Sequence, residues 1–161
     1  MKNNKTIVAR VLGIVCALLM LAVVVFQFLP AWQLDEESMS IAEYTWFPYE
    51  TSKWHPNNYN DFNKFFRAEL EDDLVSAGDI AGGHALILIC SLFGAVLCAV
   101  RGTKKLSYIV GAVAGLIGVW EYMMQPLYVL TPLGMPLLIL SAAVTVVSIA
   151  GFVLTYVNKK N

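Results

Sequence analysis

The feature that most constrains this chain is a set of four long apolar runs within only 161 residues. A helix of about 20 apolar residues crosses the hydrocarbon core of a bilayer, because each residue adds about 1.5 Å to its length. The runs cover residues 11–29, 80–100, 106–123 and 132–157. Only 14% of the residues are charged, which is too few for the surface of a soluble domain. The sequence therefore predicts an all-α membrane protein, one domain over residues 1–161 in which four transmembrane helices form a bundle.

The charges between the runs are sorted by sign, and this sorting predicts the orientation. Residues 1–10, 101–105 and 158–161 contain basic side chains and no acid. Residues 30–79, between the first two runs, hold eleven acids against three Lys or Arg. Basic segments next to transmembrane helices stay in the cytoplasm. We therefore expect a multi-pass protein of the cell membrane, the cytoplasmic membrane of a bacterium, with both termini inside and residues 30–79 outside.

Several chemistries find no support in the sequence. The first run is too long for a cleaved signal peptide and has no small-residue cleavage site after it, so we expect a retained anchor. The three cysteines, Cys16, Cys90 and Cys98, all lie within the runs, where free cysteine usually serves in packing. The chain has no HExxH, P-loop or GxSxG motif. We expect a non-enzymatic protein without a cofactor, a metal site or a nucleic-acid partner.

Residues 30–79 have an organisation of their own, which predicts an outward cap. Strand-like runs at 31–34 and 41–47 flank a polar Asp-Glu-Glu-Ser stretch and predict a β-hairpin. Residues 61–74 place Phe and Leu at spacings of three and four, which predicts an amphipathic helix. Gly78 ends that helix, and Asp79 is the predicted cap of the second transmembrane helix.

The cap is crowded with aromatic side chains: Trp32, Trp46, Phe47, Tyr49 and Trp54. Two interpretations stay open. The rings form an interfacial belt and the small core of the cap, because Trp and Tyr favour half-wet positions. Alternatively, they form a recognition surface for a membrane or extracellular protein, since the acids of the cap repel anionic headgroups.

Three polar residues interrupt the apolar runs near their outer ends, namely Gln27, His84 and Glu121. His84 and Glu121 lie 17 and 16 residues from the basic turn at 101–105, which places both about 25 Å from the cytoplasmic side. Ionisable side chains at such a depth usually face the bundle interior and have a partner. We expect His84 and Glu121 to be partners, with Tyr122 and Asp79 close enough to join them. The cluster is then either a set of groups wetted at the interface or a pocket for a cation or a small polar ligand.

The third run carries a stripe of small residues at Gly111, Gly115 and Gly118. Small residues in this spacing let two transmembrane helices approach closely. The fourth run carries a matching stripe of Ser and Thr. The sequence predicts that the glycine face packs against another helix, either of the same chain or of a second copy in a homo-oligomer.

Four spans with a long first outer loop resemble the layout of the claudin-like tetraspan proteins. That family carries a W…GLW…C…C signature in the loop. Here Trp32 and Trp46 are present, but residues 30–79 contain neither GLW nor cysteine, so junction or channel function does not carry over. The strings FQFLPAW and YTWFP are also similar to small four-span proteins of Gram-positive bacteria, a likeness that implies no activity.

These patterns predict two functions of different class. The first is an accessory or interaction subunit of the membrane that uses its aromatic, acidic cap. The alternative is a protein that binds or transports a small molecule or an ion through the polar pocket.

Overall fold

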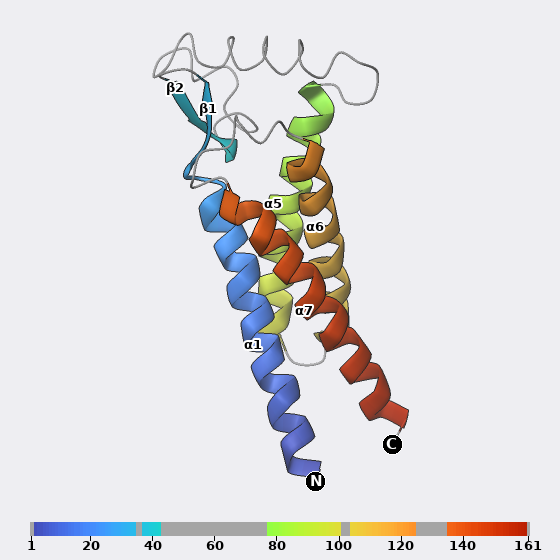
Figure 1. Ribbon diagram of the computed structural model, residues 1–161. Helices are drawn as coiled ribbons and strands as arrows, with labels where there is room; N and C mark the ends of the chain where they lie inside the picture. Colours follow the sequence, from blue (N-terminus) through green and yellow to red (C-terminus); the bar gives the residue numbers. More distant parts are fainter. Residues whose placement is uncertain (1, 35–36, 43–76, 101–103, 125–134, 161) are drawn as a thin grey trace.

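The computed structural model describes residues 2–34, 37–42, 77–100, 104–124 and 135–160. Its helices are α1 (Lys2–Phe26), α5 (Ala77–Ala99), α6 (Lys104–Met124) and α7 (Met135–Lys160). Each contains a stretch long and apolar enough to cross a membrane. The helices run up and down beside one another, and the two termini lie at the same end of the bundle (Figure 1). The chain is therefore a multi-pass membrane protein with four spans, as the apolar runs predict.

The four helices form a closed ring around one core. Helix α1 packs against α5 and α7, and α6 packs against the same two helices from the opposite corner. Buried apolar side chains from all four helices fill the centre: Cys16, Met20, Val23, Ile87, Ala95, Tyr108 and Val144. Most of the remaining large apolar side chains point outward, among them Leu18 (60% exposed) and Ile139 (67% exposed). Such an apolar exterior is unfavourable in water and favourable in lipid.

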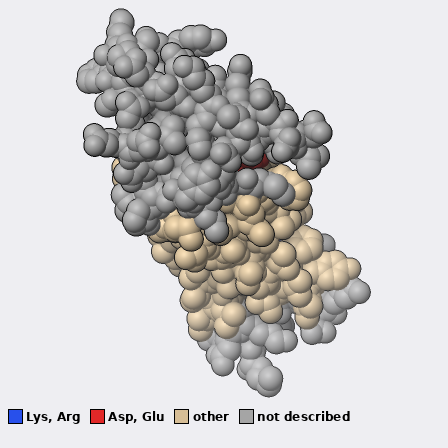
Figure 2. All heavy atoms as spheres, turned by 45° about the horizontal axis from the view of Figure 1, so that its top comes forward, with Lys and Arg blue, Asp and Glu red and all other residues tan. Residues whose placement is uncertain are grey.

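Figure 2 shows one side of the molecule with basic side chains in blue and acidic side chains in red. The described wall of the bundle is neither blue nor red over almost all of this side, and one red patch lies at its upper border. Charged side chains are costly at membrane depth. The absence of colour on this described wall is what a lipid-facing surface requires.

The glycine stripe of α6 lies against α7, within the chain. A Cβ on Gly115 would lie 2.7 Å from the carbonyl oxygen of Ser141 and 2.8 Å from the backbone nitrogen of Thr145. A Cβ on Gly111 would meet the Ser148 side chain of α7, and a Cβ on Gly118 would meet the Ser141 side chain of α7. The Thr145 hydroxyl donates a hydrogen bond of 2.9 Å back to the Ser141 carbonyl, and its oxygen also lies against Gly115. The two backbones approach closely because α6 has no side chain at these positions.

Buried hydroxyl and thiol groups link the other helix pairs. The Ser107 hydroxyl donates to the Gly94 carbonyl oxygen at 2.8 Å, which joins α6 to α5. Its single proton is then used, so the Cys98 thiol is the donor of the 2.7 Å contact with the Ser107 oxygen. Cys16 of α1 and Ser148 of α7 are hydrogen-bonded at 3.3 Å. In this structure Cys16 and Cys98 are free thiols that serve in packing between helices.

The first helix ends earlier than the apolar run predicts. It stops at Phe26, and residues 27–29 form a turn instead of the last part of a span to residue 29. Phe28 and Leu29 donate their N–H groups to carbonyls three residues back, which tightens the end of the helix. Pro30 follows, and the residue before a proline disfavours the helical conformation. Hydropathy alone does not predict this helix end, because residues 28 and 29 are as apolar as the last residues of the helix.

Two short strands follow α1, β1 (Pro30–Leu34) and β2 (Glu37–Ser40), and they pair antiparallel. Their register shifts between Pro30 and Trp32. The second strand predicted at 41–47 is wrong at its start, because Ile41 and Ala42 are helical and the mostly polar segment Glu37–Ser40 pairs instead. The backbone pairs here through groups that every residue has, so a polar segment can form the strand. Residues 43–47 and the amphipathic helix predicted at 61–74 lie outside the described residues.

Helix α5 also begins earlier than predicted. It starts at Ala77, so Gly78 and Asp79 lie inside its first turn, and the prediction that Asp79 is the capping residue is wrong. An acidic residue in the first turn still interacts favourably with the positive end of the helix dipole.

Candidate functional site

Two of the three polar residues predicted to interrupt the spans, Gln27 and His84, lie with Tyr122 at the end of the bundle that carries the strands. Gln27 lies in the turn after α1, His84 on α5 and Tyr122 on α6, and all three are 0% exposed. We call these three residues the polar cluster. Helices α5 and α6 and the turn after α1 contribute to it, and its side chains are buried, so it belongs to the bundle interior.

The centre of the cluster is a ring contact between α5 and α6. The ring centroids of His84 and Tyr122 are 5.4 Å apart, and the planes are tilted by 35°. This is within the range of favourable contacts between aromatic rings. His84 therefore lies against Tyr122, which brings together two of the residues predicted to share a site.

Gln27 and Tyr122 bring polar atoms to this interior. The Gln27 side chain lies near the Tyr122 hydroxyl, but without the geometry of a hydrogen bond. Within the described part of the chain, both amide atoms of Gln27 and the Tyr122 hydroxyl are buried without a hydrogen-bond partner. The Ser141 hydroxyl on α7 is in the same condition, and it flanks Gly118, one turn from Tyr122. Each such atom costs about 1–3 kcal/mol, unless a water or a ligand satisfies it.

Glu121 lies on a different face of α6 from Tyr122. Its carboxylate packs against Gly83 of α5, where a Cβ would collide with it. It also lines a lateral groove of about 750 Å³ between α5 and α6, together with Trp120 and Leu116. Trp120 and Leu116 are 60% and 56% exposed, so this groove opens toward lipid. The described geometry places Glu121 at the edge of the bundle, beside the residue that precedes His84.

The other predicted site residues are not characterised at the side-chain level. Asp79 is placed by the backbone of α5, and Trp32 by the backbone of β1. The aromatic residues at 46, 47, 49 and 54 lie outside the described residues.

One backbone contact ties the segment after the strands to the cluster. The Ala42 N–H donates a 2.9 Å hydrogen bond to the carbonyl oxygen of Gln27. Ser40, Ile41 and Ala42 are 4%, 0% and 2% exposed. Residues 40–42 are therefore packed onto the bundle at the level of the polar cluster.

The polar cluster is closed to the exterior of the bundle, because its three side chains are fully buried. The lateral groove is lined by residues of α5 and α6 that do not include His84, Tyr122 or Gln27. Among the described residues no group of three or more His, Cys, Asp or Glu side chains could hold a metal ion. The cluster can position side chains and hold an internal water, and the groove can offer a carboxylate to a ligand that arrives through the bilayer.

Two residues of this region were not predicted from the sequence. Gly83 lies against the Glu121 carboxylate, and Ser141 carries a buried hydroxyl although the sequence predicts only helix packing for its stripe. A signal for the arrangement on α6 was present. Residues 111, 115, 118 and 122 continue one stripe at spacings of four, three and four, which places Tyr122 on the buried glycine face. Glu121 precedes Tyr122 by one position, about 100° around the helix, and so faces elsewhere.

The chain matches no protein-family model, no curated protein and no solved structure. The likeness in layout to claudin-like proteins stays a prediction, and the function has to be argued from the residues of this chain.

Proposed function

We propose that the chain is a non-enzymatic protein of the cell membrane that acts as an interaction subunit through its outer segment. Both termini lie in the cytoplasm, and residues 30–79 lie outside. The charge distribution supports this orientation, because bases without acids flank the spans at the end that holds the termini. The same composition suits the cytoplasmic membrane of a bacterium.

The observation that carries the proposal is the tie between Ala42 and Gln27. A loop that only connected two spans could leave the bundle without packing on it. Here the segment is held by a buried hydrogen bond and by three buried residues at its start. The bundle then serves as a rigid base, and a rigid base lowers the entropy that the outer segment loses when it binds.

The charge of the outer segment indicates the chemistry of its partner. Eleven acids against three Lys or Arg make residues 30–79 strongly acidic. An acidic surface with aromatic residues fits a protein with a basic patch, since complementary charge accelerates association and aromatic side chains supply contact area. Anionic lipid headgroups are disfavoured for the same reason.

The proposal is tested by purification in mild detergent from cells that make the full chain, after cross-linking at the outer surface. Four acids of the outer segment are neutralised together: Glu69→Gln, Glu71→Gln, Asp72→Asn and Asp73→Asn. The control neutralises the three bases of the same segment and leaves the cytoplasmic charges intact: Lys53→Gln, Lys64→Gln and Arg67→Gln. We expect one defined partner to be captured by the wild type and the control, with at least tenfold less captured by the acid variant. Equal capture by all three chains would remove the outer segment from the function.

The alternative, a site for a small molecule or an ion, is favoured by the buried polar atoms of Gln27 and Tyr122 that have no partner among the described residues. A ligand at the cluster would satisfy them. Mass measurement of the same purified protein under native conditions separates the two functions. A small molecule or ion that stays with the wild type and leaves in Gln27→Leu would establish the alternative.

A further inference from the structure

A second hollow lies at the opposite end of the bundle, between α1 and α5. Its volume is about 320 Å³, within the range of ligand pockets of about 300–1,000 Å³. Its walls are made of small residues, Gly13 and Ala17 on α1 and Ala95 and Ala99 on α5. The two helices touch elsewhere along their length, so the missing side-chain volume at these positions leaves the space.

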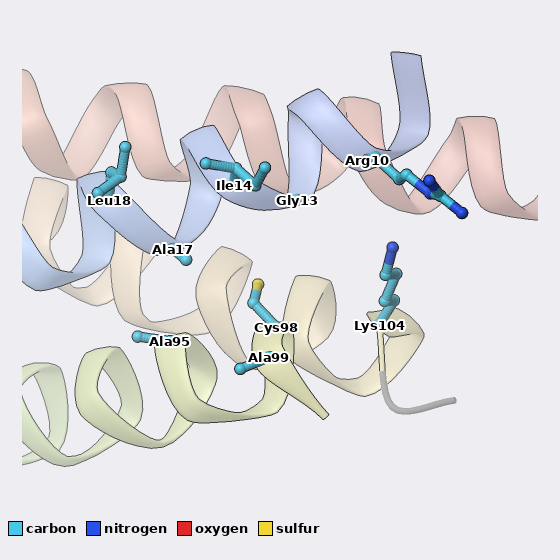
Figure 3. Close-up of a pocket in the computed structure, with 9 residues that line it drawn as sticks. All are labelled: Arg10, Gly13, Ile14, Ala17, Leu18, Ala95, Cys98, Ala99 and Lys104. Carbon is cyan, nitrogen blue, oxygen red and sulfur yellow. The ribbon is translucent and has the colours of Figure 1, made fainter. Parts of the chain in front are cut away.

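The hollow is a groove that opens toward the bilayer. Ile14 and Leu18 form its rim on α1, and they are 61% and 60% exposed. In the close-up, Ala17 and the Cys98 thiol point into the gap between the two helices (Figure 3). A lipid chain can therefore enter from the side, along apolar walls.

Two cations stand at one end of this apolar groove. Arg10 comes from α1 and Lys104 from the first position of α6, and the Lys104 side chain extends toward Arg10 (Figure 3). No acid is among the residues that line the groove. Two like charges that converge repel each other, and an anion between them turns this repulsion into attraction. Guanidinium and ammonium groups are the usual protein ligands of phosphate.

The order of these features decides the occupant. The cations lie at the end of the bundle that holds the termini, and the apolar part of the groove runs from them toward the middle of the membrane. A free phosphate would use only the cations and would leave the apolar groove empty. An amphiphile with an anionic head uses both, in the orientation that it already has in a bilayer leaflet.

We propose that this groove binds an anionic phospholipid, with the phosphate between Arg10 and Lys104 and one acyl chain between α1 and α5. Basic pockets between transmembrane helices recognise such headgroups through the same chemistry. The site is independent of the outer segment and of the polar cluster, which lie at the other end of the bundle.

The first test measures lipid binding to the purified full chain by native mass spectrometry, with phosphatidylglycerol compared against phosphatidylcholine. We expect retention of phosphatidylglycerol, and we expect Arg10→Gln and Lys104→Gln each to weaken it about fivefold. The matched control is Lys105→Gln, because Lys105 is adjacent to Lys104 but stands 6.0 Å above the Tyr156 ring instead of lining the groove. Equal weakening by Lys105→Gln would show diffuse surface charge and overturn the proposal.

The second test needs no charge substitution. In a Cys90→Ala chain, the half-buried Cys98 thiol faces the groove, whereas Cys16 is fully buried. An acyl chain in the groove should shield Cys98. We therefore expect a lipid-soluble maleimide to label Cys98 several-fold more slowly in phosphatidylglycerol than in phosphatidylcholine. Equal protection by phosphatidylcholine would mean that the headgroup is not recognised. Equal protection by glycerol phosphate would mean that the site takes a free anion. Either result contradicts the proposal.

Discussion

At the scale of single residues, two buried hydroxyl groups on α6 differ in their surroundings. The Ser107 hydroxyl donates to the Gly94 carbonyl and accepts from Cys98, so its hydrogen-bonding capacity is used. The Tyr122 hydroxyl is equally buried but has no hydrogen-bond partner within the described part of the chain. Within a bilayer no bulk water reaches such a group, so this difference has an energetic consequence.

Removing each hydroxyl should therefore change the free energy of unfolding differently. Tyr122→Phe removes a group without a partner and should leave the free energy of unfolding unchanged or slightly higher. Ser107→Ala removes the hydrogen bonds to the Gly94 carbonyl and the Cys98 thiol, and should lower the free energy of unfolding by about 1–2 kcal/mol. Both values can be measured by denaturant unfolding in mild detergent. A loss in Tyr122→Phe as large as in Ser107→Ala would show that the hydroxyl has a bound water, ion or ligand.

At the scale of helices and strands, hydropathy was enough to predict four spans. The spacing of small residues was enough to predict that the glycine face of α6 packs against another helix. Both follow from local sequence, since a span needs length and a close helix pair needs missing side chains. The helix ends could not be predicted in the same way. The end of α1 at Phe26 depends on local backbone hydrogen bonds, and the strand at Glu37–Ser40 depends on its pairing with Pro30–Leu34. Neither signal is carried by the polarity of the side chains.

The packing of α6 on α7 gives a prediction with a control on another helix. Gly115→Ala places a methyl group within 3 Å of backbone atoms at Ser141 and Thr145, which cannot move aside as a side-chain end can. It should lower the free energy of unfolding by about 1–3 kcal/mol. Gly82→Ala meets nothing within 4 Å and should be neutral or stabilising by up to about 1 kcal/mol, because alanine favours a helix. Thermal unfolding of both variants in the same detergent measures the difference. If the two behave alike, α6 and α7 do not meet at Gly115.

At the scale of the whole molecule, the two ends of the bundle have different chemistry. At the end with the termini, Tyr108 packs against Gly151 of α7 and lies near Gly13 of α1. Gly13 also lines the groove that carries Arg10 and Lys104. At the other end, the polar cluster lies next to residues 40–42, which the hydrogen bond from Ala42 to Gln27 holds against the bundle. The proposed interaction surface and the proposed lipid site therefore require opposite sides of the membrane, and both depend on one orientation.

That orientation can be tested with single cysteines in a chain whose native cysteines are replaced by alanine. Glu71→Cys should react with a membrane-impermeant maleimide that is added to intact cells, because the positive-inside rule places the acidic segment outside. Lys159→Cys follows the last span and should react only after the cells are opened. Labelling is read as a mass shift on a gel, and a second addition of reagent after lysis controls for reactivity. If Lys159→Cys reacts in intact cells and Glu71→Cys does not, the orientation is inverted. The acidic segment would then face the cytoplasm, and Arg10 and Lys104 would face the outer leaflet, which would remove the basis of the proposed function.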